Sequence, residues 1–147
     1  MSGSGPSDRT ISSLNVEQAK HAAQKMEDTI AGLVPDEYVA KRDQVPKGSL
    51  LSCSKDSYQW SGQTDVYLQG SPDVDGILDR IAQHWKGSEN YTVIRGKAGD
   101  GTPQVRIDGA HNAGYIVGPW KSNSQLLILS FSPCFRLPED ADPGGTF

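Results

Sequence analysis

The sequence contains no apolar run long enough to cross a membrane as a helix. Its most hydrophobic stretch, "LLILSF" at 126–131, has the length of a β-strand and falls well short of the ~18 residues that a membrane-spanning helix needs. Clustered cations are also missing, since the 14 lysines and arginines are spread along the chain and the formal net charge is −4. Binding to nucleic acids or anionic membranes rests on such clusters, so we expect neither activity.

Cysteine is scarce, with one residue at position 53 and the other at position 134. This wide separation excludes a CxxC redox motif, and no further Cys or His stands at the spacing of a zinc site. Nothing beside Cys53 in "SLLSCSKDS" would lower the pKa of its thiol, as a catalytic cysteine requires. Two interpretations of the cysteine pair remain.

The first interpretation is a disulfide between Cys53 and Cys134. Cys53 lies in the first stretch of strand-like sequence and Cys134 follows the last one, so a bridge would tie the ends of the sheet together. Disulfides persist in oxidising compartments, and this interpretation therefore predicts an exported protein. The alternative is two buried free thiols in a cytosolic protein.

Catalytic and cofactor-binding motifs are also absent. "GKAGDGT" at 96–102 is rich in glycine but lacks the Lys-Ser/Thr end of a phosphate-binding loop. "DVDG" at 73–76 leads into an apolar helical pattern instead of toward the closing Glu of a calcium loop. His21, His84 and His111 stand on three separate elements without a nucleophile motif. We therefore expect no enzymatic activity, no metal and no cofactor.

Hydrophobic periodicity predicts the fold. Apolar residues at steps of three and four indicate amphipathic helices at 15–34 and 71–87, whereas 50–69 alternates with a period of two. Four further strands are predicted between turn-rich segments, at 91–95, 103–108, 114–120 and 125–132. We predict an α+β fold in the order α-β-β-α-β-β-β-β, with an antiparallel sheet of about five or six strands and two helices packed on one face.

The ends of the chain are polar. We expect one domain at 12–138, a flexible linker at 1–11 and a flexible C-terminal tail at 139–147. "MSGSGPS" resembles the linker that remains when a leader or anchor has been removed, which agrees with export. Taken literally, a start without an apolar leader indicates the cytosol.

The strand that contains "QLLILSF" is apolar on both sides. Such a strand is usually covered on both faces, but a two-layer domain leaves one sheet face open. We expect the connector at 35–50 to cover that face. The alternative is that the face binds a partner or lipid, and its candidate residues are Tyr115, Trp120 and His111.

The arrangement resembles a known group of proteins. The first helix is followed by "LLSC" and "YQWSGQTDVYL", then by "DVDGILDRIAQHW", and the last strand ends in "SFSPCFRLP". In this order and in its paired cysteines, 12–138 resembles small actinobacterial cell-envelope lipoproteins and secreted domains of the mycobacterial LppA type. The resemblance implies an exported, often lipid-anchored and disulfide-bonded protein of unknown function, although this chain has no lipobox.

These observations predict an extracytoplasmic, non-enzymatic binding or accessory module of a bacterial envelope. We expect a monomer that recognises a protein or another envelope component, and that meets the membrane only through an N-terminal anchor. The alternative is a cytosolic acidic partner-binding protein, such as an inhibitor, an immunity protein or a secretion chaperone. The negative field of such a protein would complement basic targets.

Overall fold

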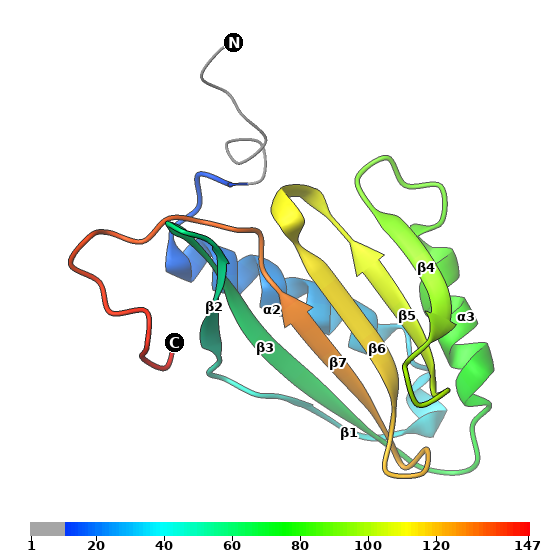
Figure 1. Cartoon of the computed structure of the whole chain (residues 1–147). Coiled ribbons are helices and arrows are strands. Elements are labelled where there is room, and N and C mark those ends of the chain that lie inside the picture. Colours follow the sequence, from blue (N-terminus) through cyan, green and yellow to red (C-terminus); the bar gives the residue numbers. More distant parts are fainter. Residues whose placement is uncertain (1–10) are drawn as a thin grey trace.

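Residues 11–147 form a seven-stranded antiparallel sheet with two α-helices on one of its faces (Figure 1). The computed structural model describes these residues, and 1–10, nearly all of the predicted linker, lie outside them. The predicted α+β class and the order of helices and strands are confirmed, with one strand more than expected. In chain order the elements are α2 (Val16–Gly32), a short 3-10 helix η1 (Asp36–Tyr38), β1 (Val39–Gln44), β2 (Ser49–Ser54), β3 (Ser57–Leu68), α3 (Val74–Trp85), β4 (Thr92–Lys97), β5 (Pro103–Asp108), a 3-10 turn η2 (Ala110–Asn112), β6 (Gly114–Trp120) and β7 (Gln125–Phe131).

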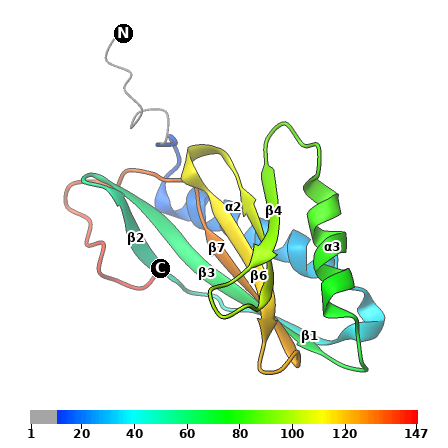
Figure 2. The same cartoon turned by 45° about the vertical axis from the view of Figure 1, so that its right-hand side comes forward.

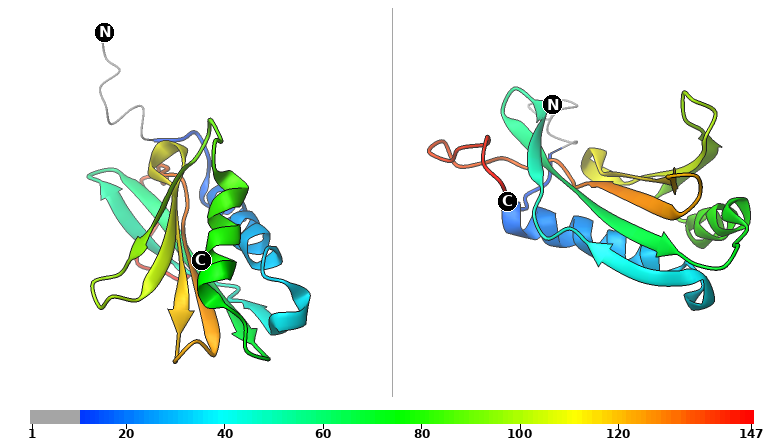
Figure 3. Two further views of the ribbon diagram at one scale, coloured as in Figure 1. Left: turned by 90° about the vertical axis from the view of Figure 1, so that its right-hand side faces the viewer. Right: turned by 90° about the horizontal axis from the view of Figure 1, so that it is seen from below.

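The strands are arranged in the order β1-β3-β7-β6-β5-β4, and β2 also pairs with β3. The long strand β3 is paired with β2 along its first half and with β1 along its second half. Helix α2 lies on β3 and β7, while α3 lies on β4, β5 and β6, so both helices cover the same face (Figure 3). Because side chains alternate along a strand, every second residue enters the main core. The sheet side of that core consists of Val66, Val105, Ile107, Tyr115, Val117, Leu126 and Ile128.

Helix α2 begins at a capping box. The backbone N–H of Gln18 donates to the side chain of Asn15 at 2.8 Å, and the N–H of Asn15 donates to the side chain of Gln18 at 3.0 Å. Along the helix, Ala19 and Ala23 are fully buried against Trp60 of β3. Their small side chains let the helix approach the sheet closely at this end.

Strand β1 lies in the segment that was expected to be a connector covering the open face of the sheet. That expectation is wrong, because β1 pairs edge to edge with β3 and leaves the face uncovered. The physical reason is that the side chains which β1 turns inward are polar and form hydrogen bonds to α2, which holds the strand at the edge of the sheet. Arg42 donates to the carbonyl oxygens of Ala31 at 3.0 Å and Val34 at 2.9 Å, and so satisfies the end of α2.

The C-terminal residue is docked on the domain. Phe147 exchanges two backbone hydrogen bonds with Gly48, at 2.7 and 3.0 Å, and its carbonyl accepts from the indole Nε1 of Trp60 at 3.0 Å. Residues 139–147 were predicted to be a flexible tail. Their mobility stays a prediction, but the end of this segment packs against a second apolar cluster built on Trp60 and Phe135.

Candidate functional site

The face of the sheet opposite the helices, called the open face below, has an apolar centre. Its side chains have the opposite parity to those of the core, because neighbouring residues of a strand point to opposite faces. Ile116 of β6 lies opposite Leu129 of β7. At the rim, Ile94 is 49% exposed and Trp120 is 53% exposed. The apolar residues of the open face include Leu51, Ile94, Ile116, Trp120, Leu127, Leu129 and Phe131.

Two glycines shape this face. Along β6 the open-face positions are Gly114, Ile116, Gly118 and Trp120, so each glycine leaves space where a side chain would otherwise stand. Gly118 borders a hollow of about 200 Å³ that Trp120 also lines. Gly114 borders a hollow of about 350 Å³, and Ile116 lines both of them.

A third hollow, of about 370 Å³, lies toward β2 and β3 and is lined by Ser61, Gln63 and Leu129. Leu129 also lines the hollow beside Trp120. The three hollows therefore share lining residues and form one depressed surface around the centre of the sheet. This shape suits a ligand that makes extended contact with the face.

Several charged groups near this surface already have hydrogen-bond or ion-pair partners. The Nε of Arg106 lies 3.0 Å from the Asp108 carboxylate, and both residues line the hollow at Gly114. The Asp65 carboxylate accepts from the amides of Gln63 at 3.3 Å and Gln125 at 3.0 Å. The centre of the open face thus combines apolar surface with hydrogen-bonding groups, as protein interfaces do.

The three predicted surface residues are not brought together, which corrects the sequence-based grouping. Trp120 lies on the open face, but Tyr115 points into the core and is 3% exposed. The reason is strand alternation, because two residues five positions apart on one strand face opposite sides. Burial raises the pKa of the Tyr115 phenol. His111 lies in the turn before β6, at the far end of that strand from Trp120.

The turn that contains His111 is tied to the end of the sheet. His111 has a left-handed backbone with φ of 56°, and its carbonyl accepts from the N–H of Cys134 at 2.8 Å. The side-chain amide of Gln59 donates to the carbonyls of Asn112 at 2.6 Å and Ser132 at 3.1 Å. The backbone of His111 is therefore part of the frame around the disulfide.

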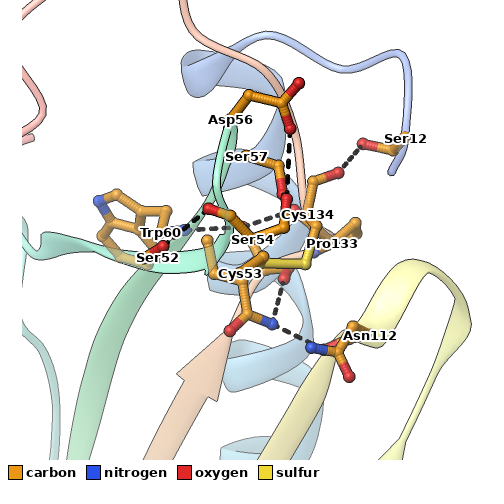
Figure 4. Close-up of a disulfide and its surroundings, with 12 residues drawn as sticks. Ser12, Ser52, Cys53, Ser54, Asp56, Ser57, Trp60, Asn112, Pro133 and Cys134 are labelled. Atoms are coloured by element: carbon orange, nitrogen blue, oxygen red, sulfur yellow. Dashed lines mark hydrogen bonds between the residues drawn. A yellow bond between two sulfur atoms is a disulfide. The ribbon is translucent and has the colours of Figure 1, made fainter. Parts of the chain in front are cut away.

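The predicted disulfide is present (Figure 4). The sulfur atoms of Cys53 and Cys134 are 2.12 Å apart, and the bond joins β2 to the segment after β7. Ser12 donates to the carbonyl of Cys134 through both its N–H and its hydroxyl, each at 2.7 Å. Four separate parts of the chain meet at this point, next to the hollow that Gln59 and Asn112 line.

One buried ionisable group was missed from the sequence. Glu27 of α2 is fully buried, and its carboxylate accepts from Thr64 at 2.7 Å and from Ser130. Burial raises the pKa of this carboxyl group. The signal in the sequence was its spacing: Glu27 follows Ala23 by four residues, as Ala23 follows Ala19, so all three lie on the same face of the helix. Glu27 faces the interior between helix and sheet, so it takes no part in the open face.

The part of the chain that the structure describes has neither a metal cluster nor a membrane helix. Within residues 11–147, His, Cys, Asp and Glu do not form a group of three or more that is able to hold a metal ion. Neither α2 nor α3 has the length and apolar character that crossing a bilayer requires.

Comparisons with known proteins give one similarity of fold. No protein-family model matches the chain, and no curated protein matches it in sequence. The chain is similar to the crystal structure of a DUF4853 family protein from Actinomyces odontolyticus, with a TM-score of 0.54 and 12% identity. The similarity covers 90% of this chain and 75% of that one. The fold of this chain is therefore similar to that of an actinobacterial DUF4853 family protein.

Proposed function

We propose that this chain is an extracytoplasmic, non-enzymatic binding module of a bacterial envelope, and that it holds a protein partner on the open face. The observation that carries the proposal is the depressed apolar centre around Ile116 and Leu129. Contiguous apolar patches on a monomer's surface frequently mark interaction sites. Arg106, Asp108 and Gln59 at the rim supply the polar contacts that give such interfaces their specificity.

The Cys53–Cys134 disulfide supports the envelope location. Disulfides form and persist in oxidising compartments and are rare in the cytosol. The similarity in fold to an actinobacterial protein agrees with an origin in that group. Attachment through an N-terminal lipid, as in LppA-type lipoproteins, is the more specific form of the same proposal.

The test of the open face is position-specific photo-cross-linking in cells of the source organism. A benzophenone amino acid replaces Trp120, and a matched control carries it at Lys25, which is exposed on α2. We expect a discrete product from position 120 that is absent from position 25. Leu127→Glu, which places a charge on the open face, should abolish the product. Equal products from both positions would contradict the proposal.

The location is tested in the same cells by alkylating free thiols under denaturing, non-reducing conditions. We expect no labelling before reduction and two labelled cysteines after it. Two free thiols in freshly lysed cells would contradict export and favour the cytosolic acidic partner-binding protein instead. For the cross-linking variants, thermal unfolding of each purified protein confirms that loss of the cross-linked product reflects a change of the surface and not of the fold.

A further inference from the structure

The sheet has three strands at its edges, and two of them carry protection against pairing with other chains. β1 has an irregular register between Val39 and Lys41, and its sequence is highly charged. β2 has an irregularity between Ser52 and Ser54, and Thr146 bridges to Ser49 at its other end. Bulges, charges and covering segments are the usual means by which natural sheets block their edges.

β4 lacks this protection. It pairs with β5 in an unbroken register from Thr92 opposite Asp108 to Lys97 opposite Pro103. Within residues 11–147 no strand pairs with its outer side. Ile94 is 49% exposed, and the charge of Arg95 is directed to α3, where it contacts Asp75 at 2.7 Å and Asp79 at 3.1 Å. A regular, uncovered edge of this kind is a template for an added strand.

The hairpin register shows which backbone groups face outward. The N–H of Ala98 donates to the carbonyl of Thr102 at 2.7 Å, and hydrogen-bonded pairs alternate along an antiparallel ladder. Thr92, Ile94 and Gly96 therefore bond to β5. The N–H and C=O groups of Val93 and Arg95 point away from the sheet and are available to another strand.

Helix α3 runs alongside this edge (Figure 2). Between the two lies a groove of about 240 Å³ with an apolar floor made by Ala82 and Val93. Lys86 lines one end, and the Arg95–Asp79 pair lines the other. Strand addition beside a helix is an established mode of peptide recognition, in which the backbone gives affinity and pockets select alternate side chains.

We propose that β4 pairs with an extended segment of the partner protein, which adds an eighth strand to the sheet. An apolar side chain of that segment lies over Ala82 and Val93, and a carboxylate of the segment lies near Lys86. Within residues 11–147 Lys86 takes part in no ion pair, whereas Asp79 is already paired with Arg95. Arg95 is shared between Asp79 and Asp75, so Lys86 is the cation of this groove that has no carboxylate partner in the described part of the chain, and it complements an acidic residue of the segment. The inference rests on the proposed function as a protein-binding module.

A single strand fits this edge better than a second copy of the chain. In a copy paired edge to edge through β4, a second α3 would lie on the same side of the joined sheets and would have to be accommodated beside the first. A strand contributes only its own backbone and alternate side chains. A strand added to β4 also extends the open face, because Ile94 lies both on the edge strand and on that face.

The experiment selects binders from a displayed library of short unstructured peptides and maps them by amide hydrogen exchange on the purified chain. We expect the selected peptides to contain an apolar residue and a nearby carboxylate. On binding, the amides of Val93 and Arg95 should gain protection. Lys86→Glu should weaken the binding of acidic peptides.

A matched pair of variants isolates the backbone contact. Val93→Pro removes the outward N–H and leaves the bonds to β5, while Val93→Ala removes the same side chain and keeps the N–H. We expect Val93→Pro to weaken peptide binding about tenfold or more, because a ladder bond is lost and the partner's carbonyl is left unsatisfied. Val93→Ala should bind more tightly than Val93→Pro.

Three results would overturn the inference: no selected peptide, peptides that leave the Val93 and Arg95 amides unprotected, or equal binding by the two Val93 variants. Protection of these amides by self-association alone, at a concentration where sedimentation shows a dimer, would assign the edge to a second copy instead. If β4 takes no strand while cross-linking from position 120 persists, the open face remains the binding site and this inference alone fails. If Val93→Pro does not fold, the exchange measurement on the unmodified chain decides.

Discussion

A single buried carboxyl group sits where helix and sheet meet. Glu27 lies on α2 between Ala23, which packs on Trp60, and Ile30, which belongs to the main core. Its two hydroxyl partners come from β3 and β7. Beside it, a Cβ on Gly62 would lie 2.2 Å from the Trp60 ring and 3.1 Å from the Glu27 carboxylate. The bare backbone at position 62 is therefore what allows the helix, Trp60 and Glu27 to share this space.

Glu27 should make stability depend on pH. Because burial raises its pKa above the ordinary 4.5, the folded protein keeps the proton to a higher pH than the unfolded chain does. This contribution to the free energy of unfolding is fully present below pH 4.5 and is lost as the pH rises through the raised pKa. As the pH rises through that pKa, we expect the Glu27→Gln variant to become more stable relative to the native chain. Urea unfolding from acidic to neutral pH measures the difference.

Glu27→Gln is itself the control, since the amide can still bond to both hydroxyl groups but does not titrate. A difference in unfolding free energy between the two proteins that stays constant with pH would contradict the prediction. Other pH-dependent groups are common to both proteins and cancel in this comparison.

Single residues also show where sequence reasoning succeeds and where it fails. The placement of Cys53 and Cys134 around the predicted strands favoured a disulfide over two free thiols, and the structure contains the disulfide. Tyr115 was misplaced, although its odd distance from Trp120 on one strand already set the two on opposite faces. Glu27 was missed because burial of a carboxylate depends on hydroxyl partners 37 and 103 positions away, which no local pattern reveals.

At the scale of elements, regular apolar spacing was sufficient for the helices and for most strands. β1 was the exception, because the side chains that it turns inward are Arg42 and Gln44 instead of apolar residues. Gln44 donates to the carbonyl of Gln24 at 3.0 Å, and Arg42 bonds to the end of the same helix. The strand is thus specified by its hydrogen bonds to α2, and these are tertiary contacts. A period-two pattern with polar inward positions is indistinguishable from a solvated connector in sequence.

Arg42 should therefore stabilise the junction of α2 and β1. It bonds to the carbonyls of Ala31 and Val34 and pairs with Asp36 at 2.9 Å. We expect Arg42→Ala to lower the free energy of unfolding by about 1–2 kcal/mol, because charge-assisted hydrogen bonds to the helix end are lost. Urea unfolding measures the change.

Arg42→Lys separates geometry from charge. Lysine keeps the positive charge near the C-terminal end of the helix but lacks the planar fork that reaches two carbonyls and a carboxylate together. It should recover only part of the lost stability. Full recovery would show that the helix dipole and not the hydrogen bonding supplies the effect.

At the scale of the whole molecule, the disulfide closes one end of the sheet. It connects β2 to the segment after β7, and Cys134 in turn bonds through its backbone to Ser12 and His111. The next residue, Phe135, bridges to Tyr58 and anchors the second apolar cluster. The chain beyond the last strand is thus fixed against the start of β3, and with it the turn that borders the hollow at Gly114.

Replacing both cysteines tests how much the fold depends on this closure. The bond spans 81 positions, for which the chain-entropy estimate of its contribution is about 4.5 kcal/mol. Natural domains of this size have a total of about 5–15 kcal/mol, so Cys53→Ala with Cys134→Ala should leave a protein close to its unfolding threshold. Guanidinium unfolding measures the loss, and reduction of the native chain should produce the same loss.

Hydrogen exchange on the reduced chain shows where the loss begins. We expect the largest acceleration at the Cys134 amide, which bonds to His111, and at Ser12, which bonds to Cys134, while Val117 and Ile128 in the middle of the sheet remain the better protected amides. The open face would then lose its hollow at Gly114 before its apolar centre. Uniform acceleration across the whole sheet would contradict this order, and would mean that the disulfide supports the fold globally instead of holding one end of the binding face.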